Sequence, residues 1–334
     1  MSLVLENPSL NRLLSYYRQQ SSFLRRELDR DPEAWEVYQR DFNSEVDRLF
    51  WQITSYEQEA LSCGRVQDAE RMKTFFARNF RKHFYYGELS RASIDKPFGY
   101  SGDFQVIDRI YSNNPVTAGY DRLFDNYFLT SAISVAVRNR KNDFKNELKA
   151  FIDSRPGEQL RVMSLACGPA REILELLEEN PAVARRVHFD CYDMEPAALE
   201  HAARMLRKWP NVSFVRANAI RMASCRDISR YLPRHYDFIY STGLFDYLDF
   251  RVSVRLVAGL RSRLNEQGAL FISDVRERYA NPSVCYMEWA GGWDLLYRSD
   301  DEFQDIFKQA GFSVSGLERR YEQQGILQYV KAWL

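Results

Sequence analysis

The sequence lacks the cysteine and histidine patterns that identify metal-binding and disulfide-rich proteins. Only five of its 334 residues are cysteines, and no two of them form a C-x-x-C pair. We therefore predict neither a zinc site nor a disulfide framework. The four histidines also lack the spacing of metal ligands, so we expect them to be structural and the protein to bind no metal. They are His83, His188, His201 and His235.

An excess of charge of either sign is missing as well. Lys and Arg total 46, and so do Asp and Glu, which gives a formal net charge of zero. Proteins that bind nucleic acid usually carry a basic excess, so we expect no nucleic-acid partner. The sequence contains no run of about 18 apolar residues, so we predict no membrane-spanning segment. The start, MSLVLENPSL, has no basic region and reaches Glu6 early, which predicts no secretory signal and a soluble, cytoplasmic protein.

What the sequence contains is a helical half followed by an alternating half. Helical spacing of apolar residues runs through the first half, at 10–28, 35–53, 66–84, 104–111 and 120–152. Buried strand patterns separated by helices follow, at 160–166, 187–192, 212–216, 236–240 and 269–273, with a closing pair at 312–317 and 326–333. This order predicts an α/β protein with a doubly wound, mostly parallel sheet. We predict a helical N-terminal domain at 1–153 and the sheet domain at 154–334.

The first predicted strand ends in a loop suited to a ligand. It reads SLACGPARE, and Gly168 and Ala170 allow close approach of the backbone. Asp193 ends the second strand 25 positions after Gly168, where an acid accepts hydrogen bonds from both hydroxyls of a ribose. The motif G-x-G-x-x-G is missing, and this loop has one glycine. A nucleoside without phosphates therefore suits it better than a dinucleotide.

A series of segments resembles the motifs of class I S-adenosylmethionine-dependent methyltransferases. In order they are SLACGPARE, CYDMEPAALEHA, VRANA, YDFIYSTGLFDYL and GALFISDV, and the resemblance covers about 155 to 334. Two positions depart from the usual motifs. Ser164 stands where an acidic residue is usual, and Ala170 stands where the last glycine is usual.

The resemblance implies a Rossmann-like methyltransferase domain with S-adenosylmethionine as its cofactor. It implies that Ala166 and Gly168 border the methionine part and that Asp193 binds the ribose. Asn218 and Ala219 would then flank the adenine. The reacting methyl group would face the end of the fourth strand, at Ser241, Thr242 and Gly243. The predicted cofactor set also includes Cys167, as a small apolar residue, and Met194.

A narrower resemblance extends into the helical half, from about residue 80. DKPFGYSGDFQVIDRIY, SLACGPARE, STGLFDYLD and MEWAGGWDLLYRS together resemble bacterial methyltransferases linked to 3-hydroxy fatty acid methyl esters. This implies methylation of a carboxylate of a small, apolar or aromatic-containing metabolite, which needs no general base. A hydroxyl or amine acceptor would need one, for which Asp246 and Tyr247 are our candidates. Tyr100 is a further candidate for a catalytic role.

Several residues have two interpretations that stay open. The loop 99–103 is a lid whose Tyr100 and Asp103 touch the cofactor, or a surface loop in which Asp103 caps a helix. Arg138 and Arg140 do not share a helix face. In one interpretation Arg138 holds the cofactor carboxylate. In the other, both arginines belong to a solvated face. The segment after the fifth strand is an acceptor wall or a hydrophobic plug, through Trp289, Trp293, Tyr297 and Arg298.

Two other functions remain as alternatives at this point. One is a nicotinamide-dependent oxidoreductase on a similar sheet, against which the single loop glycine argues. The other is a catalytically silent, methyltransferase-like module whose helical part recruits a partner. Our prediction is a methyltransferase with a small-molecule substrate, and the sequence predicts no oligomeric state.

Overall fold

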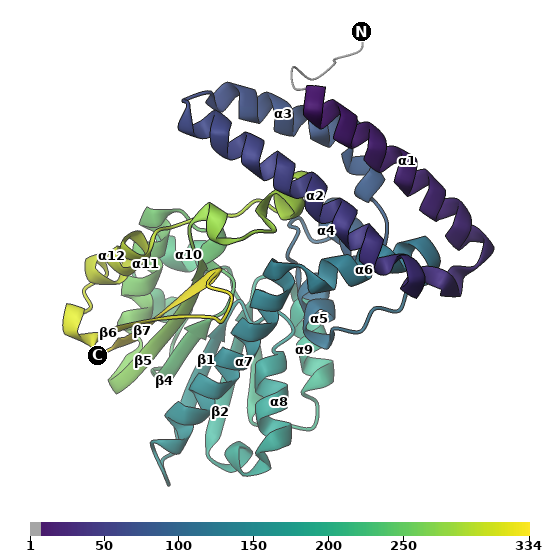
Figure 1. The fold of residues 1–334 in the computed structure, drawn as a ribbon. Helices are drawn as coiled ribbons and strands as arrows, with labels where there is room; N and C mark the ends of the chain where they lie inside the picture. Colours follow the sequence, from purple (N-terminus) through teal and green to yellow (C-terminus); the bar gives the residue numbers. More distant parts are fainter. Residues whose placement is uncertain (1–7) are drawn as a thin grey trace. The chain divides into compact units, whose positions relative to one another are not determined.

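The computed structural model describes residues 8–334 and consists of two compact units (Figure 1). We call them the helical unit (Met1–Val135 with Pro282–Asp294) and the sheet unit (Ala136–Asn281 with Leu295–Leu334). This division differs from the predicted boundary at 153/154. The long helix before the sheet belongs mostly to the sheet unit, and residues 282–294 return to the helical unit. The segment in which we predict no secretory signal lies mainly outside the described residues.

The helical unit contains six helices in its described N-terminal part. They are α1 (Pro8–Arg30), α2 (Trp35–Ser62), α3 (Val66–Asn79), α4 (Glu88–Asp95), α5 (Phe104–Ser112) and α6 (Gly119–Thr130). The predicted single helix at 120–152 is wrong, because α6 ends and α7 (Ala132–Asp153) begins around Ser131. Ser131 is extended, with φ −58° and ψ 148°, and its hydroxyl donates to the carbonyl of Phe128.

Aromatic side chains form much of the interior of the helical unit. Phe42 and Phe124 have ring centroids 4.8 Å apart, and Tyr17 stacks on Phe84 at 5.0 Å. Tyr286, from the segment that returns to this unit, lies 4.9 Å from Tyr127. The aromatic richness of the sequence therefore serves packing here, as expected for large apolar side chains.

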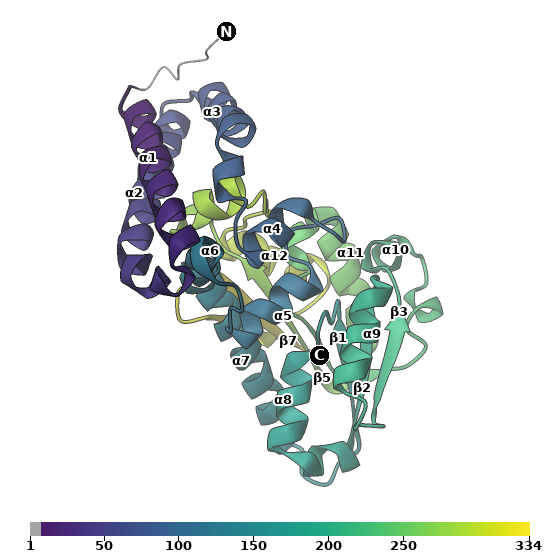
Figure 2. The same cartoon turned by 90° about the vertical axis from the view of Figure 1, so that its right-hand side faces the viewer.

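The sheet unit holds a seven-stranded sheet in the order β3-β2-β1-β4-β5-β7-β6. The strands are β1 (Leu160–Leu165), β2 (Val187–Asp193), β3 (Val212–Arg216), β4 (Tyr236–Ser241), β5 (Leu264–Val275), β6 (Leu317–Tyr321) and β7 (Leu327–Trp333). The first five strands are parallel and β7 is antiparallel to both neighbours, so the predicted fold class is confirmed. The edge strand β3 is visible in Figure 2. The predicted strand at 312–317 is wrong, since β6 begins only at Leu317, after a 3-10 helix.

Helices cover both faces of this sheet. Phe144 of α7 packs on Phe271 of β5 at 4.3 Å, and Figure 1 shows α7 and α8 (Arg171–Glu179) in front of the strands. Right-handed crossovers place α9 (Pro196–Met205) on the same face as α8. The other face packs against α10 (Ala219–Ser224), α11 (Phe250–Arg261) and α12 (Asp300–Gln309). The chain runs outward from β1 to β3 and then returns to β4, so the strand order reverses between β1 and β4.

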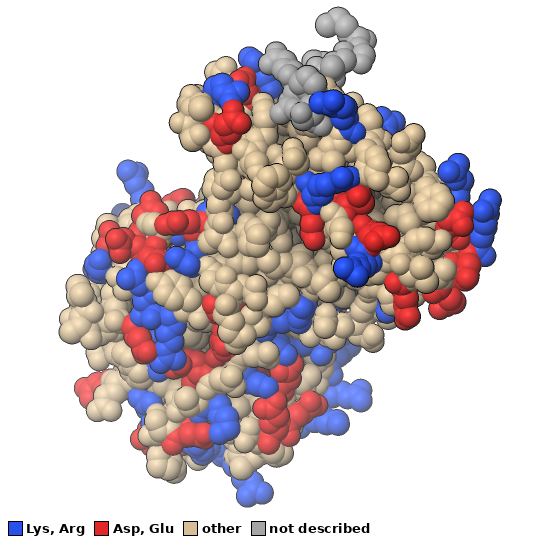
Figure 3. All heavy atoms as spheres, in the orientation of Figure 1, with Lys and Arg blue, Asp and Glu red and all other residues tan. Residues whose placement is uncertain are grey.

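The surface charges, the helices and the metal-ligating side chains of the described residues bear on the predictions about nucleic acid, membranes and metals. On the face shown in Figure 3, basic and acidic side chains are interspersed. None of the helices in the described part of the chain is long and apolar enough to cross a membrane. Among the same residues, no cluster of three or more His, Cys, Asp or Glu side chains could hold a metal ion.

Candidate functional site

The loop between β1 and α8 is open on the side of its glycine. Gly168 has φ +51°, and a Cβ built there would meet no other atom within 4 Å. Its backbone N–H donates to Oδ2 of Asp193 over 2.9 Å. The preceding N–H, that of Cys167, donates to the carbonyl of Tyr192 at 3.0 Å. Hydrogen bonds therefore hold the loop against the end of β2, and the side of the loop on which a Gly168 side chain would stand is open to a ligand.

Two alanines of this loop have left-handed backbone conformations. Ala166 has φ +54° and Ala170 has φ +50°. Ala170 therefore keeps the backbone shape that a glycine would adopt more easily, although it departs from the usual motif. Such conformations cost about 1–2 kcal/mol for a residue with a side chain and tend to cluster at functional sites.

Asp193 is buried, with 6% of its surface exposed, and its carboxylate is held by the backbone. Oδ1 accepts from the N–H of Glu195 at 2.9 Å, while Oδ2 accepts from Gly168. Burial raises the pKa of Asp193, and the backbone N–H groups of Glu195, Gly168 and Met194 act against that rise. Each carboxylate oxygen has a second lone pair. A carboxylate offers about four lone pairs in all, so the side chain can still accept a hydrogen bond from a ligand such as a ribose hydroxyl.

A pocket of about 520 Å³ lies beyond the carboxyl ends of β2 and β3. Its size is within the usual range for small-molecule sites. Asn218 caps the N-terminus of α10 there, and its side chain accepts from the N–H of Arg221 at 3.1 Å. Ala219 follows and is mostly buried. The lining residues are Met194, Arg216, Ala217, Asn218, Arg221 and Tyr231.

The predicted residues at the end of β4 also lie at this edge of the sheet. Ser241 is buried, and its hydroxyl donates to the carbonyl of Leu165 at 2.9 Å, so its side chain links two strands. The carbonyl of Thr242 accepts from Ser273 at 2.7 Å. A Cβ on Gly243 would lie 3.2 Å from Nη2 of Arg140. Gly243 has no side chain, and the guanidinium of Arg140 lies close to the space that a side chain there would occupy.

Arg140 belongs to a buried cluster of four charged side chains in the sheet unit. It is 4% exposed, so the interpretation that it belongs to a solvated face is wrong. Its Nη1 lies 3.6 Å from Oδ2 of Asp246, whose Oδ1 accepts from the N–H of Val275 at 2.8 Å. The fold buries this face of α7 against the sheet, which two arginines at i and i+2 do not reveal in the sequence.

Asp274 and Arg298 complete this cluster, which we call the acid–arginine cluster (Arg140, Asp246, Asp274 and Arg298). Arg298 donates to Oδ1 of Asp274 at 2.9 Å and to the carbonyls of Phe245 and Leu248. Burial raises the pKa of both Asp246 and Asp274. The neighbouring Asp246 carboxyl raises the pKa of Asp274 further. The guanidinium of Arg298 is engaged in this cluster, and its place in an acceptor wall stays a prediction.

The four residues predicted to form that wall are divided between the two units. Trp289 is completely buried in the helical unit, and its indole N–H donates to Oε1 of Glu57 at 3.3 Å. Its burial fits the plug interpretation, and its contact with an acceptor stays a prediction. Tyr297, in the sheet unit, has its ring 5.6 Å from the guanidinium carbon of Arg278. Tyr247, our candidate base beside Asp246, is 37% exposed.

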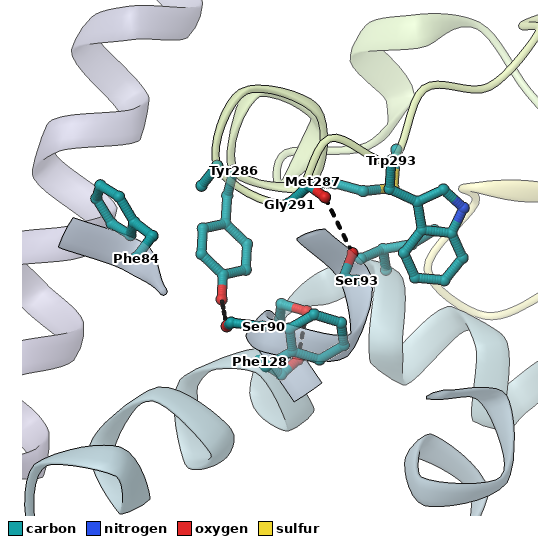
Figure 4. Close-up of a pocket in the computed structure, with 11 residues that line it drawn as sticks. Phe84, Ser90, Ser93, Phe128, Tyr286, Met287, Gly291 and Trp293 are labelled. Carbon is teal, nitrogen blue, oxygen red and sulfur yellow. Dashed lines mark hydrogen bonds between the residues drawn. The ribbon is translucent and has the colours of Figure 1, made fainter. Parts of the chain in front are cut away.

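Trp293 lines a small apolar pocket in the helical unit, shown in Figure 4. Its polar contacts are internal: Ser93 donates to the carbonyl of Gly291 at 3.2 Å, and the hydroxyls of Ser90 and Tyr286 lie 3.5 Å apart. The free volume is about 10 Å³, about that of one water. The lining residues are Phe84, Ser90, Ser93, Phe128, Ser131, Ile133, Tyr286, Met287, Ala290, Gly291 and Trp293. The plug interpretation fits this packing.

The loop with Tyr100 and Asp103 lies in the helical unit. Oδ1 of Asp103 accepts from the N–H groups of Gln105 and Val106, at 2.8 and 3.1 Å, so Asp103 caps α5. Its Oδ2 is buried and has no hydrogen-bond partner among the described residues. Burial raises the pKa of Asp103. The capping role is thus present, and the role as a lid stays a prediction.

Sequence reasoning missed a buried acid beneath the glycine loop. Glu172 is 3% exposed, and the hydroxyl of Tyr240 donates to its Oε1 at 2.8 Å. Burial raises the pKa of Glu172. The sequence held a signal, because Glu172 stands four residues before Leu176 and therefore shares the apolar face of α8.

The two cofactor residues not yet placed are Cys167 and Arg138. The neighbouring Cys191 thiol and burial raise the pKa of Cys167 well above its usual range, which agrees with a small apolar role. Arg138 lies on α7, and its buried Nη1 has no hydrogen-bond partner in the described part of the protein. One turn later, Lys141 donates to Glu175 of α8. Arg138 therefore lies on the side of α7 that faces the beginning of α8.

Comparison with known proteins gives a family and a fold. The family described as "Putative methyltransferase" matches residues 23–332. "Uncharacterized protein YnbC" of Escherichia coli is 24% identical over 220 residues, which are 62% of this chain but only 36% of that protein. The chain thus spans about a third of the length of this curated relative.

Among the similar solved structures, that of Bordetella parapertussis agrees with the fold. A "possible exported protein" of Bordetella parapertussis has a TM-score of 0.60 at 18% identity, over 79% of this chain and 96% of that one. Magnesium protoporphyrin IX methyltransferase of Synechocystis, solved with bound SAM, has a TM-score of 0.48 at 12% identity, over 74% and 97% of the two chains.

Proposed function

The chain belongs to the methyltransferase family whose residues it matches from 23 to 332, and on this premise we propose that it methylates a carboxylate of a small, apolar metabolite. The family confirms the predicted enzyme class and agrees with S-adenosylmethionine as the cofactor. It also decides against the nicotinamide-dependent alternative. The observation that carries the proposed site is the bond from Gly168 to Asp193 beside an open pocket.

The residues at the ends of β1 to β3 fit the nucleoside part of this cofactor. The carboxylate of Asp193 retains capacity to accept a hydrogen bond from the ribose. Gly168 presents an open surface in place of a side chain. The pocket lined by Met194 and Asn218 would take the adenine, with Ala219 at its edge. We propose that Ala166 and Cys167 border the methionine part.

Arg138 would hold the cofactor carboxylate. Its buried Nη1 has no hydrogen-bond partner among the described residues, which is costly, and a carboxylate is the group that pairs best with a guanidinium. The free Nη1 of Arg138 lies on the side of α7 that faces α8, whose beginning is the glycine loop. This arrangement supports the choice of Arg138 in the sequence analysis.

The chemistry requires alignment more than proton transfer. When bound, the cofactor supplies a methyl group on a sulfonium, which leaves with the electron pair of its carbon–sulfur bond. Ser241, Thr242 and Gly243 would border the transfer position at the end of β4. Orientation of two reactants can contribute about 7–11 kcal/mol. A carboxylate is already ionised near neutral pH, so Asp246 and Tyr247 would be needed as bases only for a hydroxyl or amine acceptor.

The finer parts of this proposal rest on the narrower resemblance. We propose a 3-hydroxy fatty acid as the acceptor, and Tyr100 and Asp103 as residues that touch the cofactor. The buried, unpartnered Oδ2 of Asp103 supports a ligand there. We also propose Trp293 and Tyr297 as acceptor contacts, and a cytoplasmic location. The five free cysteines support a reducing compartment.

The test is a transfer assay with methyl-labelled S-adenosylmethionine and 3-hydroxydecanoate. We expect a labelled methyl ester and one equivalent of S-adenosylhomocysteine per ester formed. A cell extract from which the labelled product is identified by mass spectrometry serves as a second acceptor source. Cofactor binding without any labelled product would instead favour the catalytically silent module.

A further inference from the structure

One edge of the sheet unit carries a concentration of positive charge that the balanced composition of the whole chain conceals. Residues 204–230 contain seven of the 46 Lys and Arg residues but only one of the 46 Asp and Glu residues. That acid, Asp227, accepts the backbone N–H of Ser229 at 3.0 Å and caps a 3-10 helix. The seven basic side chains are all exposed, and we call them the basic edge: Arg204, Arg207, Lys208, Arg216, Arg221, Arg226 and Arg230.

The basic edge is not neutralised by acids of the same chain. None of its seven side chains forms an ion pair with an acid of residues 8–334. Basic side chains elsewhere in the sheet unit are often paired: Arg276 lies 3.1 Å from Asp300, and Arg320 lies 2.7 Å from Glu318. Like charges on one surface repel each other, and a partner of opposite charge relieves this repulsion.

The strand that runs along the basic edge is uncovered. β3 ends the seven-stranded order and pairs with β2. Its first four residues are only partly buried and Arg216 is exposed, whereas β1, β2 and β4 consist almost entirely of buried residues. Figure 2 shows β3 at the outer edge of the sheet, beside α9 and below α10.

Two residues of β3 direct their backbone groups away from the sheet. The carbonyl of Asn211 and the N–H of Ala217 both bond to β2. Because the bonding direction alternates along a strand, the odd-numbered residues between them also face β2. The N–H and C=O groups of Phe214 and Arg216 therefore point outward. An edge of this kind can pair with a further extended chain.

We propose that this edge binds an extended acidic segment of a partner protein, which adds a strand beside β3. The backbone of the segment pairs with the outward groups of Phe214 and Arg216, and its carboxylates lie beside the basic side chains. Lys208 stands four residues before β3 and Arg221 stands five residues after it, so positive charge flanks the strand at both ends.

The uncovered strand decides between an acidic protein and other polyanions. The phosphates of a nucleic acid or of a lipid surface match the charge, but they do not supply the alternating donors and acceptors with which a strand edge pairs. An acidic peptide supplies both. This inference goes beyond the proposed methyl transfer and does not depend on it.

The probe is a fluorescently labelled dodecapeptide of alternating Glu and Thr, and anisotropy measures its binding to the full chain. We expect the acidic peptide to bind with an affinity that falls as salt is raised. A matched peptide of alternating Lys and Thr should not bind. Poly(U) and vesicles of phosphatidylglycerol are the competing polyanions, and both should bind more weakly than the peptide.

A double variant tests the charge of the edge. Arg207→Gln with Lys208→Gln removes two charges near the beginning of β3 and should weaken binding of the acidic peptide by about fivefold or more. The matched control removes two exposed arginines of α11, through Arg251→Gln with Arg255→Gln. Since the total charge changes equally, the control should bind within about twofold of the wild type.

The backbone pairing is tested separately. Phe214→Pro removes an outward N–H and leaves the bonds to β2, because proline is tolerated on edge strands. It should weaken peptide binding by about fivefold or more, whereas Phe214→Ala, which keeps the N–H, should not. An acidic peptide with every backbone nitrogen methylated makes the same test on the wild type, in case Phe214→Pro does not fold.

Three results would overturn the inference. The first is a wild-type protein that does not bind the acidic peptide. The second is equal peptide affinity in the wild type and the variant at Arg207 and Lys208. The third is equal affinity for the methylated and unmodified peptides, or tighter binding of poly(U) or vesicles, which would show that the edge binds polyanions by charge alone.

Discussion

The backbone N–H of Gly168 donates a 2.9 Å hydrogen bond to Oδ2 of Asp193. This bond joins the loop after β1 to the acid that ends β2, two elements 25 positions apart in the sequence. It also fixes the orientation of the carboxylate. The open side of the loop and the free lone pairs of Asp193 therefore belong to one surface.

Gly168→Ala should reduce both stability and cofactor affinity. The φ of +51° is strained for alanine, so we expect the free energy of unfolding to fall by about 1–2 kcal/mol. The added methyl group would stand in the space proposed for the cofactor and should weaken S-adenosylmethionine binding by about tenfold. Gly157→Ala is the control, since Gly157 has φ +82° and equally open surroundings. Denaturant unfolding and calorimetry should show a similar loss of stability in both variants and a loss of affinity in Gly168→Ala alone.

Glu172→Gln should change how stability depends on pH. Burial raises the pKa of Glu172, so the folded protein holds its proton more tightly than the unfolded chain. As pH rises from about 4.5 through the raised pKa, the wild type therefore loses stability, by at most about 1.4 kcal/mol per pH unit. Glutamine keeps an acceptor for Tyr240 and has no charge to bury. The advantage of the variant over the wild type should grow with pH.

Urea unfolding of both proteins between pH 5 and 8 measures this difference. The matched control is Glu178→Gln, an exposed position of the same helix. Parallel stability curves for the wild type and Glu172→Gln would show that the buried acid does not titrate in this way.

Trp289→Phe tests whether the tryptophan after β5 belongs to the core. The change leaves a cavity and removes the indole N–H that Glu57 accepts, so we expect a loss of about 2–4 kcal/mol in the free energy of unfolding. Trp51→Phe, at a position 66% exposed, should stay within about 0.5 kcal/mol of the wild type. A Trp289→Phe protein of unchanged stability with a raised KM for the acceptor would restore the acceptor-wall interpretation.

The sequence predicted those parts of the site that local patterns determine. In a parallel sheet the carboxyl ends of neighbouring strands meet at one edge, so strand ends were enough to bring Gly168, Asp193 and Gly243 there. The helices of the N-terminal half were also predicted in outline, because the helical spacing of apolar residues is a local pattern. The break at Ser131 was not, because both flanking segments have helical spacing and one extended residue separates them.

The residues whose positions the sequence could not predict are those that long-range packing buries. Arg140 and Arg298 look like surface arginines, and only the packing of α7 and of the chain after β5 encloses them with Asp246 and Asp274. Trp289 was placed near an acceptor because of its position after β5. The chain instead returns to the helical unit at 282–294, and that long-range packing leaves no periodic signal in the sequence.

Calorimetric titration of S-adenosylmethionine into the wild type and Asp193→Ala tests the central claim most directly. The account predicts one site in the wild type and a loss of affinity of at least about tenfold in the variant, because the ribose hydroxyls lose their acceptor. Asp227→Ala, which removes a carboxylate that caps a 3-10 helix elsewhere in the sheet unit, should bind like the wild type. Unchanged binding by a folded Asp193→Ala protein, or no binding by the wild type, would contradict the account.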